Sequence, residues 1–216
     1  MLRLLTIEGN IGSGKSTLLE KLKNHYKNNE NIVFAPEPVA DWEKIKDTNG
    51  VTMLEKFYKD QIKHAFAFQM MAYISRLSIL RKILKEANGK DIIIITERSL
   101  YTDKYIFAKM LYEQGKIEEV DYQIYLNWFE EFAQDFPIQH CIYIKADPNI
   151  CHQRIQKRSR PGEDVIPLDY LSTCHTYHEE YVLTFPKLLT LNGNKDVYQN
   201  PDIVKEWISE IDSIAF

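Results

Sequence analysis

Gly9-Asn10-Ile11-Gly12-Ser13-Gly14-Lys15-Ser16-Thr17 is the stretch of sequence that decides the fold. It is a complete G-x-x-x-x-G-K-S/T phosphate-binding loop. Its glycines let the backbone turn N–H groups inward around phosphate oxygens, which a Cβ would obstruct. Lys15 supplies positive charge to the β- and γ-phosphates, and the Ser16 hydroxyl is placed to ligate Mg²⁺. The loop therefore predicts a site for the polyphosphate of a nucleoside triphosphate.

The segments on either side of this loop have the pattern that a phosphate-binding loop requires. Residues 2–8 are apolar and predict a buried strand, and residues 17–26 predict a helix with Leu18, Leu19 and Leu22 on one face. A strand, this loop and a helix, in that order, place bound phosphates at a helix N-terminus. A chance glycine-rich turn is the alternative, and the correct flanks argue against it.

The rest of the chain alternates short apolar runs with long amphipathic stretches, which is typical of an α/β fold. Strands are predicted at residues 2–8, 32–35, 91–96, 140–145 and 188–191. Helices are predicted at about 53–87, 101–114, 118–134, 148–158, 167–185 and 201–213. Four consecutive isoleucines, 92–95, fit a parallel sheet that is buried on both faces. We therefore expect one domain over residues 1–216, a five-stranded parallel sheet flanked by helices on both faces.

Composition narrows the class of protein. The chain has 216 residues, of which 44% are hydrophobic, so it can form one full-sized core. A net charge of −4 gives no sign of a nucleic-acid-binding face. No apolar run reaches the roughly 18 residues that a membrane span needs, and no targeting segment opens the sequence. The three cysteines are odd in number and lack metal-site spacing, so we expect buried neutral thiols in a reducing compartment. Together these features predict a cytoplasmic protein.

Ligands of such a sheet bind beyond the carboxyl ends of its strands. Gly9, Glu37, Glu97 and Asp147 all fall just past a predicted strand. Two prolines flank Glu37 and stiffen the backbone around its carboxylate. Near the phosphates, this carboxylate could take a proton from an attacking hydroxyl. From position alone, an incidental glutamate in a surface loop is an equally good interpretation.

Charged residues after the third and fourth strands suit phosphoryl chemistry. Glu97 could serve Mg²⁺, and Arg98 could neutralise a transferring phosphoryl group, although a structural ion pair is the alternative. Arg154, Arg158 and Arg160 precede or lie in a helix-breaking segment. A mobile segment that carries arginines can close over bound phosphates, so we expect a lid over about 154–165. A solvated basic face is the usual meaning of such a run, but the phosphate loop favours the lid.

Aromatic residues gather on either side of the third strand, at Trp42, Phe57, Tyr58, Phe66, Phe68, Tyr73, Tyr101, Tyr105 and Phe107. Most of them should belong to the core, because they occur at helical spacing. Gln69, Arg76 and Asp103 are polar residues among these apolar neighbours. A pocket with aromatic walls and a few polar groups suits a flat heterocycle.

Together these residues resemble the deoxynucleoside kinases. The resemblance runs from residue 4 to about residue 192 and rests on residues 9–17, 37–42, 68–69, 97–107 and 166–171. It implies a P-loop kinase fold with an arginine-bearing lid, which transfers the γ-phosphate of ATP to the 5′-hydroxyl of a deoxynucleoside for nucleotide salvage. Mg²⁺ is the implied metal, and a homodimer is the implied assembly.

The resemblance also implies a role for each matching residue. Glu37 would be the general base and Arg98 would stabilise the transition state, while Ser16 and Glu97 would hold Mg²⁺. ATP would be bound by Gly9, Asn10, Ile11, Gly12, Ser13, Gly14, Lys15, Ser16 and Thr17, and by Arg154, Arg158 and Arg160 in the lid. The deoxynucleoside would be bound by Val39, Trp42, Leu54, Tyr58, Phe68, Gln69, Ala72, Arg76, Asp103, Phe107 and Glu163. Among these, Gln69 would pair with the base edge, and Tyr58 and Glu163 would hold the 3′-hydroxyl.

Substrate choice follows from three of these positions. Ala72, Arg76 and Asp103 match the branch that resembles deoxycytidine and deoxyguanosine kinases. An Arg76–Asp103 pair would fill the space near the pyrimidine 5-position, where the thymine methyl would clash, and Arg76 could donate to purine acceptors. We therefore expect deoxycytidine or purine deoxynucleosides to be preferred over thymidine.

The chain departs from the family pattern in two places. Gly162 stands where the lid usually carries the first of two glutamates, and Glu163 matches the second. Residues 192–197, in the loop for the donor base, lack an obvious aromatic stacker, which leaves the donor nucleotide open. The physiological deoxynucleoside and any feedback inhibition are open as well.

Two other functions share this fold. A nucleoside-monophosphate kinase, such as thymidylate kinase, would need extra cations near Glu37, whose carboxylate repels a substrate phosphate. A non-catalytic structural homologue would show erosion of the reactive groups, whereas Lys15, Ser16, Glu37, Glu97 and Arg98 are all present. For the homodimer, residues 66–84 and 118–134 are the candidate surfaces, with burial in the core as the alternative.

Overall fold

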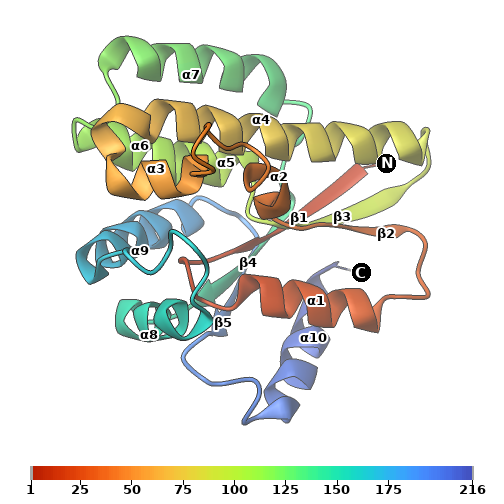
Figure 1. Cartoon of the computed structure of the whole chain (residues 1–216). Helices are drawn as coiled ribbons and strands as arrows, with labels where there is room; N and C mark the ends of the chain where they lie inside the picture. The colour runs from red at the N-terminus through yellow and green to blue at the C-terminus, as the bar shows by residue number, and fades with distance from the viewer. Residues whose placement is uncertain (1, 216) are drawn as a thin grey trace.

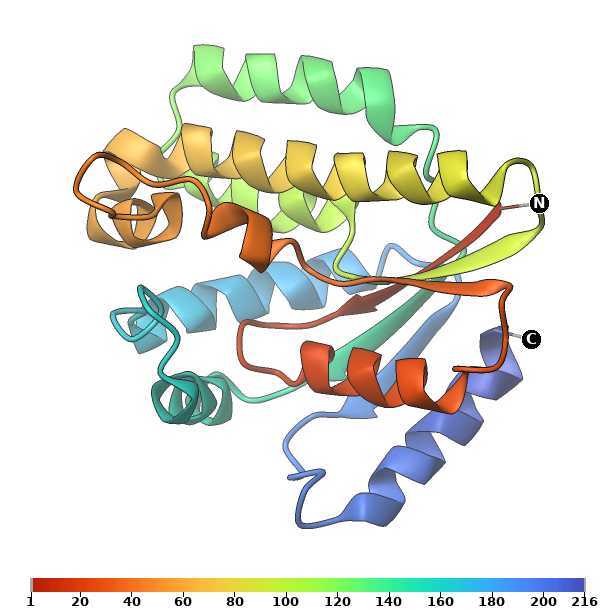
Figure 2. The same cartoon turned by 45° about the vertical axis from the view of Figure 1, so that its right-hand side comes forward.

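Five parallel strands form the central sheet (Figures 1 and 2), in a computed structural model that describes residues 2–215. They are β1 (Leu2–Glu8), β2 (Ile32–Ala35), β3 (Ile92–Glu97), β4 (His140–Lys145) and β5 (Leu188–Asn192). Their order across the sheet is β2-β3-β1-β4-β5, and every neighbouring pair is parallel. The expected sheet is confirmed; Met1 and Phe216 lie outside the described residues.

Helices cover both faces of the sheet, as the sequence predicts. They are α1 (Lys15–His25), α2 (Val39–Trp42), α3 (Met53–Lys59), α4 (Gln61–Ala87), α5 (Leu100–Thr102), the π-helix η1 (Asp103–Ala108), α6 (Lys109–Glu113), α7 (Glu119–Ala133), α8 (Pro148–Arg158), α9 (Leu168–Val182) and α10 (Pro201–Ala215). Figure 1 shows α1 and α10 on one side of the sheet and α4 on the other, with α7 outside α4. Among residues 2–215 no helix is long and apolar enough to cross a membrane.

The isoleucine run of β3 explains why both faces need cover. Ile93 and Ile95 belong to the core cluster that contains Leu18 of α1 and Trp207 of α10. Ile92 and Ile94 belong to the cluster on the opposite face, which includes buried residues of α4 and α7. Because side chains alternate along a strand, this run supplies two cores at once.

The structure corrects the sequence prediction at four places. The helix expected over 53–87 is two helices, because Asp60 leaves the helical conformation (φ −148°, ψ 86°) and its side chain accepts a hydrogen bond from the Lys63 N–H at 3.1 Å. The helix expected over 101–114 contains the π-helix η1 between α5 and α6. The loop expected after β2 contains the short helix α2, and Glu97 is the last residue of β3 rather than a residue beyond it.

The lid segment connects α8 to α9 and lies against α3. Gly162 has a φ of +82°, and a Cβ at this position would be 2.9 Å from Cγ of Glu55. Glu55 belongs to a capping box with Thr52, which starts α3. Gly162 therefore provides both the left-handed backbone and the close approach of the lid to α3.

The cysteines are buried free thiols, as the sequence predicts. Cys141, Cys151 and Cys174 are all buried and none forms a disulfide. Burial raises the pKa of Cys151 to about 11 and that of Cys174 to about 12. They are therefore neutral packing groups near neutral pH.

Candidate active site

The phosphate-binding loop joins β1 to α1, and two of its glycines are required by packing. A Cβ on Gly9 would be 2.7 Å from the carbonyl oxygen of Ile144, and one on Gly12 would be 2.6 Å from that of Cys151. Gly14 precedes the first turn of α1 with φ 107°, and open space surrounds its Cβ position. The loop is thus pressed against β4 and α8, and its last glycine sits at the helix N-terminus where phosphates bind.

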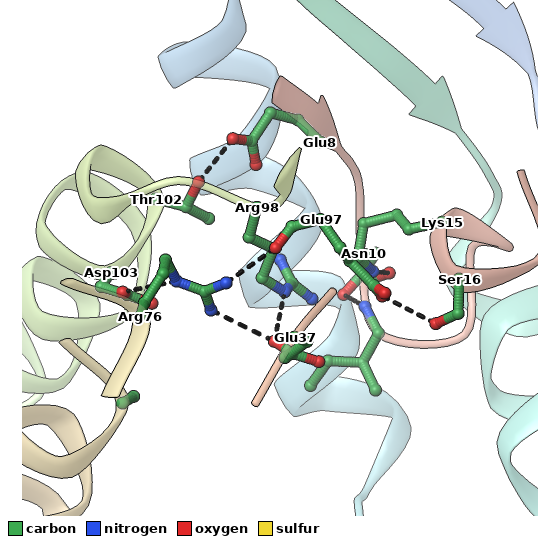
Figure 3. A network of polar contacts seen from close by, with 12 residues as sticks. Glu8, Asn10, Lys15, Ser16, Glu37, Arg76, Glu97, Arg98, Thr102 and Asp103 are labelled. Carbon is green, nitrogen blue, oxygen red and sulfur yellow. Dashed lines mark hydrogen bonds and ion pairs between the residues drawn. The ribbon is translucent and has the colours of Figure 1, made fainter. Parts of the chain in front are cut away.

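Lys15 and Ser16 begin α1 in contact with other groups of the site (Figure 3). The Lys15 ammonium donates to the Asn10 carbonyl at 2.7 Å, and burial, with Arg98 adding repulsion, lowers the pKa of Lys15 to about 8. Ser16 Oγ donates to Glu97 Oε1 at 2.7 Å. Within residues 2–215 no cluster of three or more acidic, histidine or cysteine side chains could hold a metal. Two neighbouring oxygens nevertheless fit Mg²⁺, which usually takes its other ligands from phosphates and water.

Glu37 lies between two arginines at the end of β2. Its Oε1 is 3.2 Å from Arg98 Nε and 3.4 Å from Arg76 Nη2, and the Glu37 side chain is 20% exposed. Burial alone would raise the pKa of this carboxyl group, but Arg98, Arg76 and Lys15 hold it below its ordinary value. Glu37 is therefore an ionised carboxylate at neutral pH, fixed by two guanidinium groups.

Arg98 has an unusual backbone for a residue that is not glycine. Its φ is +63°, directly after the end of β3, and its N–H donates to the Ile7 carbonyl at 3.0 Å. The guanidinium carbon lies 4.9 Å from the centroid of the Phe107 ring, and Arg98 is only 3% exposed. A left-handed arginine costs roughly 1–3 kcal/mol, so the fold holds Arg98 in place against strain, as is common at functional sites.

Arg76 and Asp103 form a buried ion pair beside Glu37. Arg76 Nε lies 3.0 Å from Asp103 Oδ2, and Arg76 Nη1 donates to the Glu97 carbonyl at 2.7 Å. Next to Asp103, the hydroxyl of Thr102 donates to Glu8 Oε1 at 2.6 Å, which ties α5 to the end of β1. Figure 3 shows the contacts of Arg76 and Glu97 as a network that reaches from Asp103 to Ser16, with the Glu8–Thr102 contact apart from it.

One cavity of about 500 Å³ brings most of the expected residues together. It is lined by Ile11, Gly12, Ser13, Gly14, Lys15, Ser16, Thr17, Glu37, Trp42, Leu54, Tyr58, Phe68, Gln69, Ala72, Glu97, Arg98, Asp103, Phe107, Arg154, Arg158, Arg160 and Glu163. Four expected residues do not line it. Gly9 and Asn10 lie in the loop, Arg76 is buried against Asp103, and Val39 borders a smaller cavity together with Trp42 and Leu54.

The end of the cavity away from the phosphate loop has aromatic walls. Phe68 stacks on Phe57 with centroids 4.5 Å apart and meets Trp42 edge-on at 5.6 Å. Gln69 is 2% exposed, and its Oε1 has no hydrogen-bond partner within residues 2–215. A buried amide oxygen without a partner is costly, so this atom is suited to receive a donor from a ligand.

The lid places its charged groups over the cavity. The Glu163 carboxylate pairs with Arg158 and with Arg160, the latter at 2.9 Å. Arg154 Nη1 donates to the carbonyl of Gly193 at 2.8 Å, so it ties α8 to the loop after β5. Two lid arginines and the glutamate expected to hold the sugar are thus already in one cluster.

The sequence interpretation missed several cavity residues. Phe57 was grouped with the core aromatics, and Tyr170 was given no role although it lies in the family motif 166–171, yet both line the cavity. Tyr198 and Trp207 also line the cavity, so an aromatic residue follows directly after the loop 192–197 that lacks one. For Tyr198 the available signal was its adjacency to that loop, and for Tyr170 it was its place in the motif 166–171.

Comparisons with known proteins agree with this geometry. The family model for deoxynucleoside kinase matches residues 5–215. The chain is 37% identical over 217 residues to a probable deoxycytidine kinase of Fowlpox virus, with 96% of this chain and 86% of that protein covered. It is 34% identical over 230 residues to the deoxycytidine kinase of Homo sapiens, with coverage of 97% and 85%. It is also 34% identical over 194 residues to the mitochondrial deoxyguanosine kinase of Xenopus laevis, with coverage of 82% and 72%. Neither a monophosphate kinase nor a non-catalytic homologue is favoured by these matches.

Proposed function

The chain belongs to the deoxynucleoside kinase family, and we propose that it transfers the γ-phosphate of ATP to the 5′-hydroxyl of deoxycytidine or a purine deoxynucleoside in preference to thymidine. Phosphorylation of deoxynucleosides follows from the family; the choice of base and the roles of individual residues are the proposal. One observation carries it. The Glu37 carboxylate lines the cavity between the phosphate loop and the aromatic walls, held by Arg76 and Arg98.

In the proposed reaction Glu37 accepts the proton of the 5′-hydroxyl. The hydroxyl oxygen forms a bond to the γ-phosphorus, the bond from that phosphorus to the bridging oxygen breaks, and ADP leaves with the electron pair. Arg98, 3.2 Å from Glu37, is placed to stabilise the charge on the transferring group. A carboxylate of lowered pKa is a weak base. This suits a loose transition state, in which the position of the 5′-hydroxyl matters more than its deprotonation.

Ser16 and Glu97 would hold Mg²⁺ beside the nucleotide phosphates. Their contact at 2.7 Å supports this, because the two oxygens already lie next to each other at the start of α1. The ion would neutralise charge on the β- and γ-phosphates. Lys15 would bind the same phosphates, and the lid residues Arg158 and Arg160 would cover them.

The preference for cytosine or purine bases rests on shape rather than on Gln69 alone. An amide offers both a donor and an acceptor, so Gln69 could pair with cytosine, adenine or, after a flip, thymine. Asp103 lines the cavity and is fixed by Arg76, which supports the proposal that the pair would occupy the space needed by a methyl group on the pyrimidine. The buried pair therefore supports exclusion of thymidine.

We also propose a homodimer formed through α4 and α7. Large apolar residues are exposed there, at Ile74 (44%), Val120 (66%), Ile124 (41%) and Trp128 (49%). These residues fall in the two segments that the sequence nominated, and the outer helix α7 offers three of them. Sedimentation at micromolar protein tests the assembly, and a monomer there would reject it.

The decisive experiment is an ATP phosphorylation assay with all four deoxynucleosides, for the natural chain and for Glu37→Gln. The Gln variant should lose about 10²-fold or more in kcat, the usual worth of a positioned general base, while the nucleoside dissociation constant stays unchanged. A near-normal kcat would remove Glu37 from the mechanism. Thymidine as the best substrate would reject the proposed preference and leave the family role intact.

A further inference from the structure

We propose that His178 is a positioning residue that fixes the guanidinium of Arg98 in its working orientation. The inference rests on the role proposed for Arg98. His178 lies on α9, 80 residues beyond Arg98 in the sequence, and it is fully buried.

The contacts of the ring define its tautomer. His178 Nδ1 lies 2.6 Å from the Cys174 carbonyl oxygen, which can only accept, so Nδ1 carries the hydrogen. Nε2 then has a free lone pair, and it lies 3.2 Å from Arg98 Nη1. Because a guanidinium has donors only, Nη1 donates and Nε2 accepts. The tautomer is assigned from these partners and makes the histidine a fixed acceptor.

The surroundings keep this ring neutral and in place. Burial lowers the pKa of His178 well below its ordinary value, and the positive charges of Arg98 and Lys15 lower it further, with His175 adding to the effect. The Tyr143 ring stacks on the imidazole at 6.4 Å, and Phe107 meets it edge-on at 6.2 Å. A neutral, immobilised imidazole keeps its lone pair on Arg98 across the working pH range.

The three contacts of the Arg98 side chain divide its nitrogens. Glu37 holds Nε, His178 holds Nη1, and the Phe107 ring lies under the guanidinium plane. Nη2 makes no hydrogen bond to any group of residues 2–215. Since Arg98 lines the cavity, the arrangement leaves one nitrogen to donate to the phosphoryl group while the other two set its direction.

Two substitutions of similar size separate positioning from packing. In His178→Gln the amide oxygen can take the place of Nε2 and still accept from Arg98. In His178→Asn the shorter amide reaches only the Cys174 side, so that bond survives and the Arg98 bond is lost. We expect the Asn variant to lose about 10- to 100-fold in kcat, the worth of one hydrogen bond to a charged group. The Gln variant should stay within about threefold of the natural chain, and the nucleoside KM should change little in both.

A double mutant supplies the control for the Arg98 link. In an Arg98→Lys background, His178→Asn should cost little more, because the bond that it removes is already absent. Equal kcat for the Asn and Gln variants would overturn the inference, as would additive losses in the Lys background. If the natural chain phosphorylates no nucleoside, the proposed function fails, which is a different result from an active enzyme indifferent to His178.

A measurement on the natural chain does not depend on how the variants fold. With ¹⁵N-labelled histidine, NMR should show His178 as the neutral Nδ1–H tautomer, with no titration in the range around the ordinary histidine pKa of about 6.5. An Nε2–H tautomer, or a His178 signal that titrates in that range, would overturn the inference.

Discussion

Replacing Arg76 by valine and Asp103 by alanine together should open the cavity to thymidine. The two side chains are 4% and 3% exposed and their atoms meet at 3.0 Å. Asp103 lines the cavity, whereas Arg76 lies behind it and also holds Glu37 and the Glu97 carbonyl. The pair is therefore both a wall of the base pocket and a support of the reacting carboxylate.

The pair must be removed as a whole. Asp103→Ala alone would leave the buried Arg76 charge without its nearest carboxylate, and breaking a buried pair costs about 3–5 kcal/mol of stability. Replacing both by apolar residues removes that penalty. It leaves the Glu97 carbonyl without one donor, a loss of about 1–3 kcal/mol. The double variant should therefore fold, with a lower melting temperature than the natural chain.

The gain for thymidine can be bounded from the size of a methyl group. One methyl in an apolar pocket discriminates by about 10- to 200-fold. We therefore expect the ratio of kcat/KM for thymidine over deoxycytidine to rise by about that factor. The kcat for both nucleosides should fall, because Glu37 loses the Arg76 contact at 3.4 Å.

A competition assay with equal amounts of both nucleosides reads this ratio directly, whatever the fraction of active enzyme. Asp202→Ala with Lys205→Ala is the matched control, since that pair is 82% and 80% exposed on α10 and neither residue lines the cavity. The control should leave the ratio unchanged. A folded double variant whose ratio stays within about threefold of the natural chain would show that the pair does not exclude thymidine.

Two further predictions concern the phosphate end and the lid. Burial lowers the pKa of Lys15 to about 8, and bound phosphates favour its protonated form. The dissociation constant of the donor nucleotide should therefore rise about tenfold per pH unit above pH 8. A dissociation constant that stays unchanged between about pH 7 and pH 10 would contradict this prediction. Gly162→Ala and Gly89→Ala both put alanine at φ +82°, a backbone cost of about 1–2 kcal/mol each. Only the Gly162 variant brings a Cβ to 2.9 Å from Glu55, so it alone should raise the nucleoside KM. Equal KM values for the two variants would show that the lid does not affect nucleoside binding.

The fold could be predicted from the sequence because its signals are local. The phosphate loop, the isoleucine run of β3 and the amphipathic helices each carry their pattern within a few turns. The break at Asp60 had a local signal too, because aspartate is a preferred N-cap residue and Asp60 is the N-cap of α4. The π-helix over Asp103–Ala108 had no such local signal; it packs against α9 and α4, which lie far from it in the sequence.

The candidate site was predictable where the motif itself supplies the reacting atoms. Glu37, Glu97 and Arg98 could be nominated because each follows or ends a strand, and parallel strands bring these ends to one edge of the sheet. Tyr170 lies in the motif 166–171 but was given no role there, and His178, on α9, lies outside every motif. His178 contacts Arg98 although the two are 80 residues apart in the sequence. A lone histidine among apolar residues of a helix is usually interpreted as a core residue.

The glycines of the phosphate loop show how one residue type answers two demands. From the sequence, all of them explain how N–H groups reach phosphate oxygens. In the structure, Gly9 and Gly12 face carbonyl oxygens of β4 and α8 at less than the distance that any Cβ tolerates, whereas open space surrounds Gly14. The first two glycines therefore set where the loop sits relative to the lid helix α8. Alanine at Gly12 would push that helix, and Arg154 and Arg158 with it, before any phosphate binds. The phosphate-binding loop of this chain therefore also sets the position of α8, which carries Arg154 and Arg158, relative to the phosphate site.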